Sequence, residues 1–384
     1  MNRLHHLYIH WPFCHSKCHY CDFVAFQNHT EFQDTYHQAL CNEIITFAQQ
    51  YPSKHSISTI FLGGGTPSLY PLPLLEQLFD TLRRHYDCSK LQEVTIEANP
   101  TDITDSSLTT WQSIGINRLS IGVQCLNDDV LQKLNRHQTI NDVYHALDRA
   151  PRYIDNISID LILGLPEITE KQWFDTLRQV VQWPIKHVSV YFLTVHEKTP
   201  LYFKLKQGTM HILHDEALVS LYEQTVELLE KYGLQQYEIS NFAKPGFASL
   251  HNTAYWDRKS YKGFGIGASS FDGHQRSTNT NNLSTYLTHT QSIPTTPPST
   301  CETIDKEQEL LELLMLGLRQ KKGVDLHHMI YFVHSDRSHG FEQRLTECIH
   351  EGFIEQHENT IRLTIKGMAL ENEVIIYLIT PKQV

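Results

Sequence analysis

The sequence predicts an α/β fold: a partial, TIM-like (β/α)6-type barrel followed by a smaller α+β domain of winged-helix-like form. Short β-rich apolar runs alternate with longer segments of helical period along the first 240 residues, a pattern typical of parallel strands joined by helical crossovers. About six or seven such units are visible, fewer than the eight of a closed barrel. We therefore expect an open barrel whose active site lies at the C-terminal ends of the strands.

The elements of the barrel follow from hydrophobic periodicity. Strands are expected at seven short apolar runs: residues 7–11, 58–62, 93–98, 118–123, 157–163, 187–193 and 236–239. Helices are expected at residues 31–50, 74–82, 105–113, 141–149, 170–182 and 215–231. The segment 74–82 illustrates the pattern, because its apolar residues recur at helical spacing: Leu74, Leu75, Leu78, Phe79 and Leu82.

Composition divides the chain into three parts: a barrel over residues 1–240, an extension with a linker over 241–300, and a helical, winged-helix-like domain over 301–384. Within the second part, residues 275–301 are rich in Ser, Thr, Asn and Pro without an apolar period, which predicts a linker or surface excursion. In the third part we expect helices at 306–319 and 341–350, and a hairpin that pairs 353–355 with 360–364.

The balance of charge argues against nucleic acid as a partner. The 384 residues include 32 Lys and Arg against 43 Asp and Glu, a formal charge of −11 that repels a phosphate backbone. The C-terminal part has 9 basic and 14 acidic residues, so its form indicates packing or protein contact rather than DNA binding. Without a signal-peptide pattern or an apolar run of about 18 residues, we expect a cytoplasmic protein that is not integral to a membrane.

Three cysteines, Cys14, Cys18 and Cys21, crowd into eight positions directly after the first predicted strand. Such crowding indicates metal or cluster ligation in a reducing compartment rather than disulfide bonds. Thiolates at this spacing can bind one 4Fe-4S cluster from a single loop, and three ligands leave the fourth iron open to an exchangeable ligand. The alternative is a zinc site whose fourth ligand is one of three nearby histidines: His10, His15 or His19.

A glycine-rich loop follows the second predicted strand in the run TIFLGGGTPS, residues 59–68. Glycine lets the backbone approach a ligand closely and leaves N–H groups free to bind anions. The run matches neither the Walker pattern nor the dinucleotide fingerprint. It is therefore either a ligand-binding loop or a tight turn.

Polar residues stand near the ends of three other predicted strands: Glu97, Gln124 and Asp160. A buried carboxylate without a partner is costly, so these groups are expected to meet a ligand, a cation or backbone donors. Each alone is equally consistent with a structural hydrogen bond. Arg136 is expected to balance the carboxylates or to bind a ligand's own carboxylate; the alternative is a solvated charge at a helix end.

The cysteine motif, with the aromatic Tyr20 before its last cysteine, resembles the signature of the radical SAM superfamily. The ordered segments YIHWPFC, CHYCDF, FLGGGTPS, IEANP, RLSIGVQ, LNR, ISIDLILGLP and YEISNFAKPG further resemble one family, from about residue 4 to 271. That family contains the oxygen-independent coproporphyrinogen III dehydrogenases, also called oxidases, and the HemW-type haem chaperones. The resemblance implies that eight residues surround S-adenosylmethionine (SAM) bound to a 4Fe-4S cluster: Tyr8, Gly64, Gly65, Thr66, Glu97, Gln124, Arg136 and Asp160.

Two departures from the dehydrogenase favour the chaperone. The dehydrogenase has a further cysteine where this chain has Phe23, and it has a long N-terminal segment before its cluster motif, whereas Cys14 already begins the motif here. The segment HNTAYW, which starts at His251, looks like a chaperone motif whose histidine is a proposed haem-iron ligand. Tyr255 and Trp256 could cover a flat porphyrin face. A lone histidine among 24 is more often not a ligand.

The resemblance thus implies a protein that binds haem as cargo and transfers it to a haem-accepting protein, while it carries the cluster and SAM. No catalytic residue is assigned, and a low-potential electron donor is a further expected partner. The alternative is an oxygen-independent coproporphyrinogen III oxidase, which decarboxylates propionates by radical chemistry that the cofactor supplies.

Overall fold

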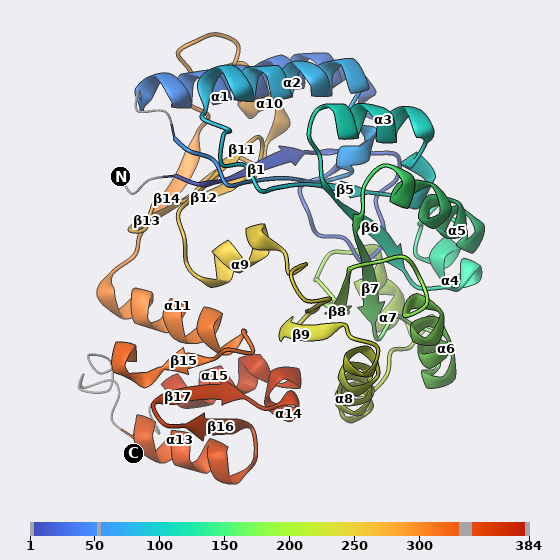
Figure 1. Cartoon of the computed structure of the whole chain (residues 1–384), viewed down its shortest axis with the longest axis vertical. Coiled ribbons are helices and arrows are strands. Elements are labelled where there is room, and N and C mark those ends of the chain that lie inside the picture. The colour runs from blue at the N-terminus through green and yellow to red at the C-terminus, as the bar shows by residue number, and fades with distance from the viewer. Residues whose placement is uncertain (1–3, 52–54, 330–339, 381–384) are drawn as a thin grey trace.

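The computed structural model describes residues 4–51, 55–329 and 340–380. It confirms the predicted α/β class: a 12-stranded sheet curves around a concave space, helices cover its convex face, and a smaller domain follows (Figure 1). The sheet has the order β14-β13-β12-β11-β1-β4-β5-β6-β7-β8-β10-β9, so its two edges are different strands and the barrel is open. None of the helices within the described ranges is long and apolar enough to cross a bilayer.

Seven neighbouring strands of this sheet are parallel. Six of them are strands that the sequence predicts: β1 (His6–Trp11), β4 (Thr59–Gly64), β5 (Glu93–Ala98), β6 (Arg118–Gln124), β7 (Asn156–Leu163) and β8 (His187–Phe192). The seventh, β11 (Tyr261–Phe264), pairs with β1 although it lies far along the chain. Parallel pairing places the carboxyl ends of these strands along one rim of the sheet, where the cysteine loop also lies.

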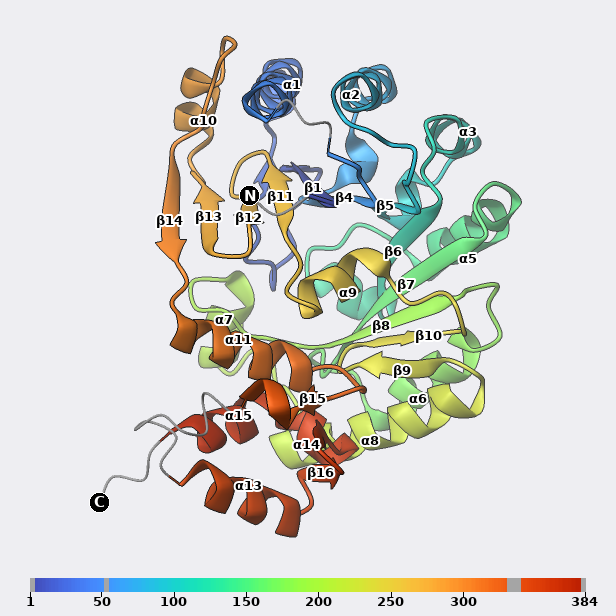
Figure 2. The same ribbon diagram turned by 60° about the vertical axis from the view of Figure 1, so that its left-hand side comes forward.

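Six helices line the outside of the arc of strands (Figure 2): α1 (Gln33–Gln50), α2 (Leu72–His85), α3 (Asp105–Ser113), α5 (Ile140–Arg149), α6 (Glu170–Val180) and α8 (Asp215–Lys231). Two short helices, α4 (Asp128–Lys133) and α7 (Pro200–Lys206), lie next to the cysteine loop, where the His19 N–H bonds the Leu134 carbonyl and the Leu201 N–H bonds the His19 carbonyl. The apolar stripe of α2 is buried as predicted at Leu75, Leu78, Phe79 and Leu82. Short 3-10 turns are η1 (Thr30–Phe32), η2 (Pro67–Leu69), η3 (Pro100–Asp102), η4 (Ala150–Arg152) and η5 (Leu326–Met329).

The sequence predicts a linker or a surface excursion over residues 275–301; this segment does not form a linker, because it extends the main sheet. It forms β13 (Gln275–Asn279), α10 (Leu283–His289) and β14 (Ser299–Thr303), and β13 pairs antiparallel with β12 (Ser269–Phe271) and with β14. All five residues of β14 are exposed, and four of the five in β13 are not buried. Backbone hydrogen bonds rather than an apolar face hold these strands, so their sequence lacks the expected alternation.

The other edge also turns antiparallel. The predicted strand at 236–239 is β9 (Gln235–Glu238), which reaches β8 only through β10 (Asn241–Ala243). After β10 the chain enters α9 (Leu250–Trp256), which lies within the arc of strands rather than outside it (Figure 2). The Glu93 carboxylate of β5 accepts backbone N–H bonds from Leu250 at 2.9 Å and His251 at 3.0 Å, which fixes the start of α9.

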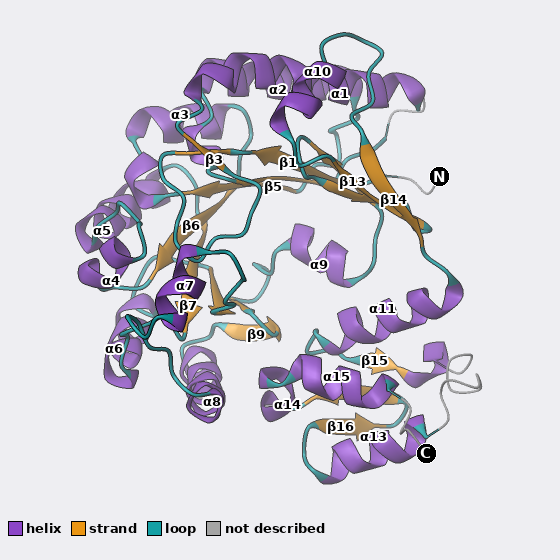
Figure 3. Cartoon of the chain, turned by 180° about the vertical axis from the view of Figure 1, so that it is seen from behind, coloured by secondary structure: helices purple, strands orange, loops and turns teal. Residues whose placement is uncertain are grey.

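The C-terminal domain has the predicted helices and hairpin. Its helices are α11 (Lys306–Leu318), α13 (Phe341–His350), α14 (Ile365–Ala369) and α15 (Glu371–Ile379), and its small sheet holds β15 (Val324–Asp325), β16 (Ile354–His357) and β17 (Thr360–Leu363) (Figure 3). Arg319 joins this domain to the barrel, because its guanidinium lies 2.8 Å from Glu238 of β9 and 3.2 Å from Glu371.

Candidate cofactor site

The three motif cysteines lie on one loop between two very short strands at the rim of the sheet. β2 (Phe13–Cys14) pairs in parallel with β3 (Phe26–Gln27), so the ends of the loop are held together. All three cysteines are partly buried free thiols. Burial raises the pKa of Cys14 to about 11, against a hydrogen bond from the Thr66 hydroxyl at 3.2 Å. A thiol held neutral in this way must release its proton when it binds a metal or cluster, because the thiolate is the form that ligates.

The loop is fixed by contacts with the segment that follows α4. Asn135 donates its amide to the Lys17 carbonyl at 2.9 Å and accepts the Ser16 hydroxyl at its own carbonyl at 3.2 Å. The backbone N–H of His19 bonds the Leu134 carbonyl at 2.9 Å. These contacts hold the cysteines in place without using their sulfur atoms.

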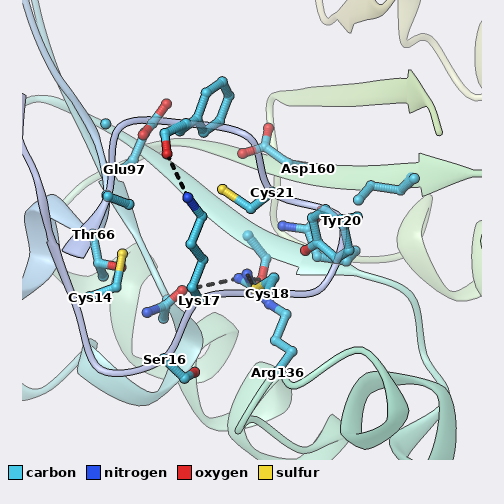
Figure 4. A pocket seen from close by; sticks show the side chains of 18 of the residues that line it. Cys14, Ser16, Lys17, Cys18, Tyr20, Cys21, Thr66, Glu97, Arg136 and Asp160 are labelled. Atoms are coloured by element: carbon cyan, nitrogen blue, oxygen red, sulfur yellow. Dashed lines mark hydrogen bonds between the residues drawn. The ribbon is translucent and has the colours of Figure 1, made fainter. Parts of the chain in front are cut away.

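A cavity of about 450 Å³ opens under this loop, and Figure 4 shows the cysteines facing it together with residues from several strands. Ten of the residues predicted from the sequence line it: Cys14, Cys18, Cys21, Gly64, Gly65, Thr66, Glu97, Gln124, Arg136 and Asp160. They come from β4 and the loop after it, from β5, β6 and β7, from the cysteine loop and, for Arg136, from the segment between α4 and α5. The structure therefore brings together residues that span almost 150 positions of the chain.

Two of the three acidic residues that line the cavity, Glu97 and Asp160, are arranged to receive positive charge. Burial, and then repulsion from Asp160, raises the pKa of Glu97 to about 8. Burial likewise raises the pKa of Asp160, while the Ser120 hydroxyl donates to its two oxygens at 3.0 and 3.1 Å. Two buried carboxyl groups with raised pKa values are stabilised in ionised form by a cationic ligand.

Arg136 supplies the opposite charge, and it is a partly buried, hydrogen-bonded residue of the cavity rather than a fully solvated charge at a helix end. Its guanidinium donates to the Gly122 carbonyl at 2.7 Å, to Asn99 Oδ1 at 3.0 Å and to Gln138 Oε1 at 2.8 Å. A fourth contact reaches the Cys18 sulfur at 3.7 Å. The cavity thus has a cation next to its thiols, and it has carboxyl groups on the side formed by the strands. This combination suits a zwitterionic ligand.

The backbone geometry of the site leaves little room for side chains. A Cβ at Gly65 would meet the Pro12 carbonyl carbon at 2.7 Å and the Cys14 sulfur at 3.0 Å, so glycine is required there for close packing against the cysteine. Gln124 has a positive φ of 68°, and the β6–β7 register shifts between Gly122 and Gln124. Strained backbone at a strand end is typical of a binding site.

The donor set fits a cluster with three thiolate ligands. Across the described ranges, no three His, Cys, Asp or Glu side chains converge as ligands of a single metal ion. Two of the histidines considered for zinc already have partners: His10 Nε2 lies 2.8 Å from the Val24 carbonyl and His19 Nδ1 lies 2.9 Å from the Lys133 carbonyl. A cubane cluster instead binds its three cysteines through three different irons.

A second cavity, of about 670 Å³, adjoins the first. Asp22, Phe23, Gly64 and Glu97 line both. Tyr8, which the family resemblance assigns to SAM, lines only this second cavity, and its hydroxyl lies 3.0 Å from His10 Nδ1. The remaining walls include Tyr255 and Trp256 of α9, Arg258, Lys259, Tyr261, Phe271, Arg276 and Leu316. Sequence reasoning missed most of this cavity because its residues are scattered and show no motif.

His251 lies behind the second cavity and is fully buried. Its Nδ1 lies 2.7 Å from the Thr59 hydroxyl and its Nε2 lies 2.8 Å from the Tyr255 hydroxyl. Burial, and then the nearby His6 and Arg118, lowers the pKa of His251 to about 3, so the ring is neutral. Tyr255, whose hydroxyl occupies His251 Nε2, lines the second cavity, whereas His251 does not.

Comparison with known proteins places this fold and site in a class. The family model of the radical SAM superfamily matches residues 8–180, and that of the HemN C-terminal domain matches residues 304–370. The fold and the cysteine-lined cavity therefore define a radical SAM protein. Among solved structures, coproporphyrinogen III oxidase (HemN) from Escherichia coli shares the fold, with a TM-score of 0.82 at 23% identity over 98% of this chain and 90% of that chain.

Curated relatives define the family more closely. Heme chaperone HemW of Bacillus subtilis is 35% identical over 96% of this chain and 97% of its own length. Heme chaperone HemW of Lactococcus lactis is 32% identical over 96% and 95%. The mouse protein named radical S-adenosyl methionine domain-containing protein 1, mitochondrial, is 29% identical over 98% and 88%. The chain belongs to the HemW family.

Proposed function

We propose that this protein is a haem chaperone: it binds haem and passes it to a haem-accepting protein, and it carries a 4Fe-4S cluster with SAM. The observation that carries this proposal is the second cavity, which combines aromatic side chains with basic ones next to the cysteine site. Aromatic faces suit a flat tetrapyrrole and basic groups suit its propionates. The names of the curated relatives support the same function.

The first cavity is proposed to hold the cluster and SAM. Cys14, Cys18 and Cys21 would hold the cluster, and the fourth iron of such a cluster would supply an open position for the amino and carboxylate groups of SAM. The raised pKa values of Glu97 and Asp160 support binding of a positively charged cofactor, while Arg136 is placed to receive a carboxylate. The chain's own contribution is to orient the cofactor and exclude water.

The alternative activity is oxidative decarboxylation of coproporphyrinogen III. The observation in its favour is that the two cavities share Gly64 and Glu97, so that a tetrapyrrole would lie close to SAM. The residue at the position of the dehydrogenase's further cysteine argues the other way: Phe23 has 64% of its surface exposed and lines both cavities. We therefore keep transfer of haem, without turnover, as the proposed function.

One experiment separates the two activities. Protein reconstituted with iron and sulfide under anaerobic conditions is given SAM, a low-potential reductant and coproporphyrinogen III, while a parallel sample is titrated with haem. We expect a saturable haem spectrum with one haem per chain and no protoporphyrinogen. Formation of protoporphyrinogen would contradict the proposal, as would failure of the protein to bind haem.

Transfer is tested with the loaded protein and an apo-haemoprotein as acceptor. We expect haem to leave the chaperone faster when the acceptor is present, because a transfer complex lowers the barrier to release. We further propose a cytoplasmic location, supported by the three free thiols of the motif, which require reducing conditions.

A further inference from the structure

The second cavity separates its charged groups into two regions. Its two acidic lining residues, Asp22 and Glu97, also line the cysteine cavity, whereas its basic residues Arg258, Lys259 and Arg276 do not. Aromatic side chains also line this cavity, among them Tyr255 and Tyr261, whose ring centroids are 4.5 Å apart. A ligand of this cavity that is planar and carries carboxylates at one edge would meet the basic region with that edge.

The basic region is built around a pair of arginines on one aromatic ring. The guanidinium carbons of Arg258 and Arg276 lie 4.7 and 5.5 Å from the ring centroid of Phe271. Arg258 has only 9% of its side chain exposed, and its buried Nη2 has no hydrogen-bond partner in the described part of the chain. A buried donor without a partner is costly, and a carboxylate at this position would satisfy it.

Two carboxylates of the C-terminal domain form ion pairs with the two arginines. Glu312 of α11 lies 2.7 Å from Arg258 Nε and 2.8 Å from Arg276 Nη1, and Glu309 lies 3.0 Å from Arg258 Nη1. Leu316, one turn further along the same helix, lines the cavity. The pair therefore already binds carboxylates, and α11 forms one wall of the cavity through these contacts.

We propose that Arg258 and Arg276 form the site for the propionate carboxylates of the bound tetrapyrrole, and that Glu312 occupies this site when no ligand is bound. The inference rests on the proposed haem-binding function and adds the recognition of the propionates. One propionate takes the free Nη2 of Arg258, and the other competes with Glu312 for Arg276. Ligand entry thereby loosens the contact between α11 and the cavity, so haem binding is coupled to the position of the C-terminal domain.

The test compares tetrapyrroles with and without free carboxylates on the reconstituted full chain. Haem, haem dimethyl ester, iron-free protoporphyrin and its dimethyl ester are titrated separately. We expect each free acid to bind about tenfold more tightly than its ester, because esterification removes the charges that the guanidinium groups receive. Retention of the difference without iron would separate carboxylate recognition from iron ligation.

The variants R258Q and R276Q are expected to bind haem about tenfold more weakly and to bind the dimethyl ester as the wild type does. The matched control is R362Q, because Arg362 pairs with Glu355 of the C-terminal domain at 2.7 Å and lines neither cavity. Iron and sulfide content and the unfolding midpoint of each variant report whether the site and fold survive the change.

The variant E312Q gives a gain that misfolding cannot imitate. Removal of the competing carboxylate is expected to tighten haem binding by about threefold or more, with no change for the dimethyl ester. Equal binding of acid and ester by the wild type, or weaker haem binding by E312Q, would overturn the arginine site while the haem function stands. Absence of haem binding by the wild type would overturn the proposed function and this inference together.

Discussion

His251 Nε2 and the Tyr255 hydroxyl oxygen lie 2.8 Å apart on successive turns of α9. The other ring nitrogen lies 2.7 Å from the Thr59 hydroxyl, so both nitrogens have partners. Ligation of haem iron by His251 therefore requires Tyr255 to release Nε2 and turn aside. We expect Y255F to bind haem about fivefold more tightly, because a hydrogen bond of about 1 kcal/mol no longer competes. Optical titration with haem measures the change.

The matched control for Y255F is Y232F, because Tyr232 is an exposed tyrosine that lines neither cavity. H251A is expected to lose the spectrum of nitrogen-ligated haem. If Y255F loses the ligated spectrum while H251A retains it, the iron binds the tyrosine oxygen and His251 is not its ligand.

Gly65 is predicted to control cluster assembly. G65A places a Cβ 2.7 Å from the Pro12 carbonyl carbon and 3.0 Å from the Cys14 sulfur, so backbone or cysteine must move. We expect iron and sulfide per chain to fall after anaerobic reconstitution. The control is G208A, where a Cβ meets nothing within 4 Å but φ is +70°; it should cost about 1 kcal/mol of stability and leave cluster content unchanged. Full cluster content in G65A would contradict the argument.

The cysteines themselves allow a direct test of the cluster. C14A, C18A and C21A are each expected to abolish the 4Fe-4S spectrum, because each substitution removes one of the three thiolates that hold the cluster. C301A is the control, since Cys301 is exposed on β14 and lines neither cavity. A normal iron and sulfide content in any of the three motif variants would remove that residue from the proposed ligands.

Arg136 is predicted to set the affinity for SAM. R136Q loses the partly buried charge but keeps an amide that can reach part of the same network of Gly122, Asn99 and Gln138. We expect SAM to bind tenfold to about a hundredfold more weakly, the effect of losing a charged hydrogen bond. R152Q is the control, because Arg152 is an exposed residue paired with Asp148. Unchanged SAM affinity in R136Q, measured by calorimetry, would exclude this role.

The sequence predicts the cofactor cavity well because local patterns mark each of its parts. Cys14, Cys18 and Cys21 lie within eight consecutive residues, so one loop carries all three thiols. Glu97 and Asp160 are marked because each interrupts an apolar strand. Once the strands are parallel, their ends meet at one rim, and the residues must converge.

The second cavity could not be predicted in the same way. Arg258 follows a helix that lies inside the barrel, and Arg276 lies on β13, in a segment whose polar composition predicts a linker. The register of β12 with β13, which pairs Phe271 with Arg276, decides that these groups meet. Such a pairing depends on tertiary structure and leaves no periodic signal in the sequence.

The last prediction concerns His187, a fully buried residue of β8. Its Nδ1 lies 2.8 Å from the Ser158 hydroxyl and its Nε2 lies 2.9 Å from the Tyr237 hydroxyl. Burial, and then the charge of Arg118, holds the pKa of His187 well below its ordinary value. The ring is therefore neutral in the folded protein, while in the unfolded chain it titrates near pH 6.5.

The sign of the pH dependence follows from this difference. Below about pH 6.5 the unfolded chain binds a proton that folded His187 does not, so the free energy of unfolding falls as the pH falls. His187 alone lowers the free energy of unfolding by about 2 kcal/mol at pH 5 relative to pH 7. H187Q is expected to be less stable at pH 7 by about 1 to 2 kcal/mol through altered hydrogen bonds, yet to lose about 2 kcal/mol less than the wild type between pH 7 and pH 5. Urea unfolding at both pH values measures the two differences, and H350Q, at an exposed histidine, should leave the pH effect unchanged. An H187Q variant with the wild-type pH effect would show that His187 takes up its proton in the folded state.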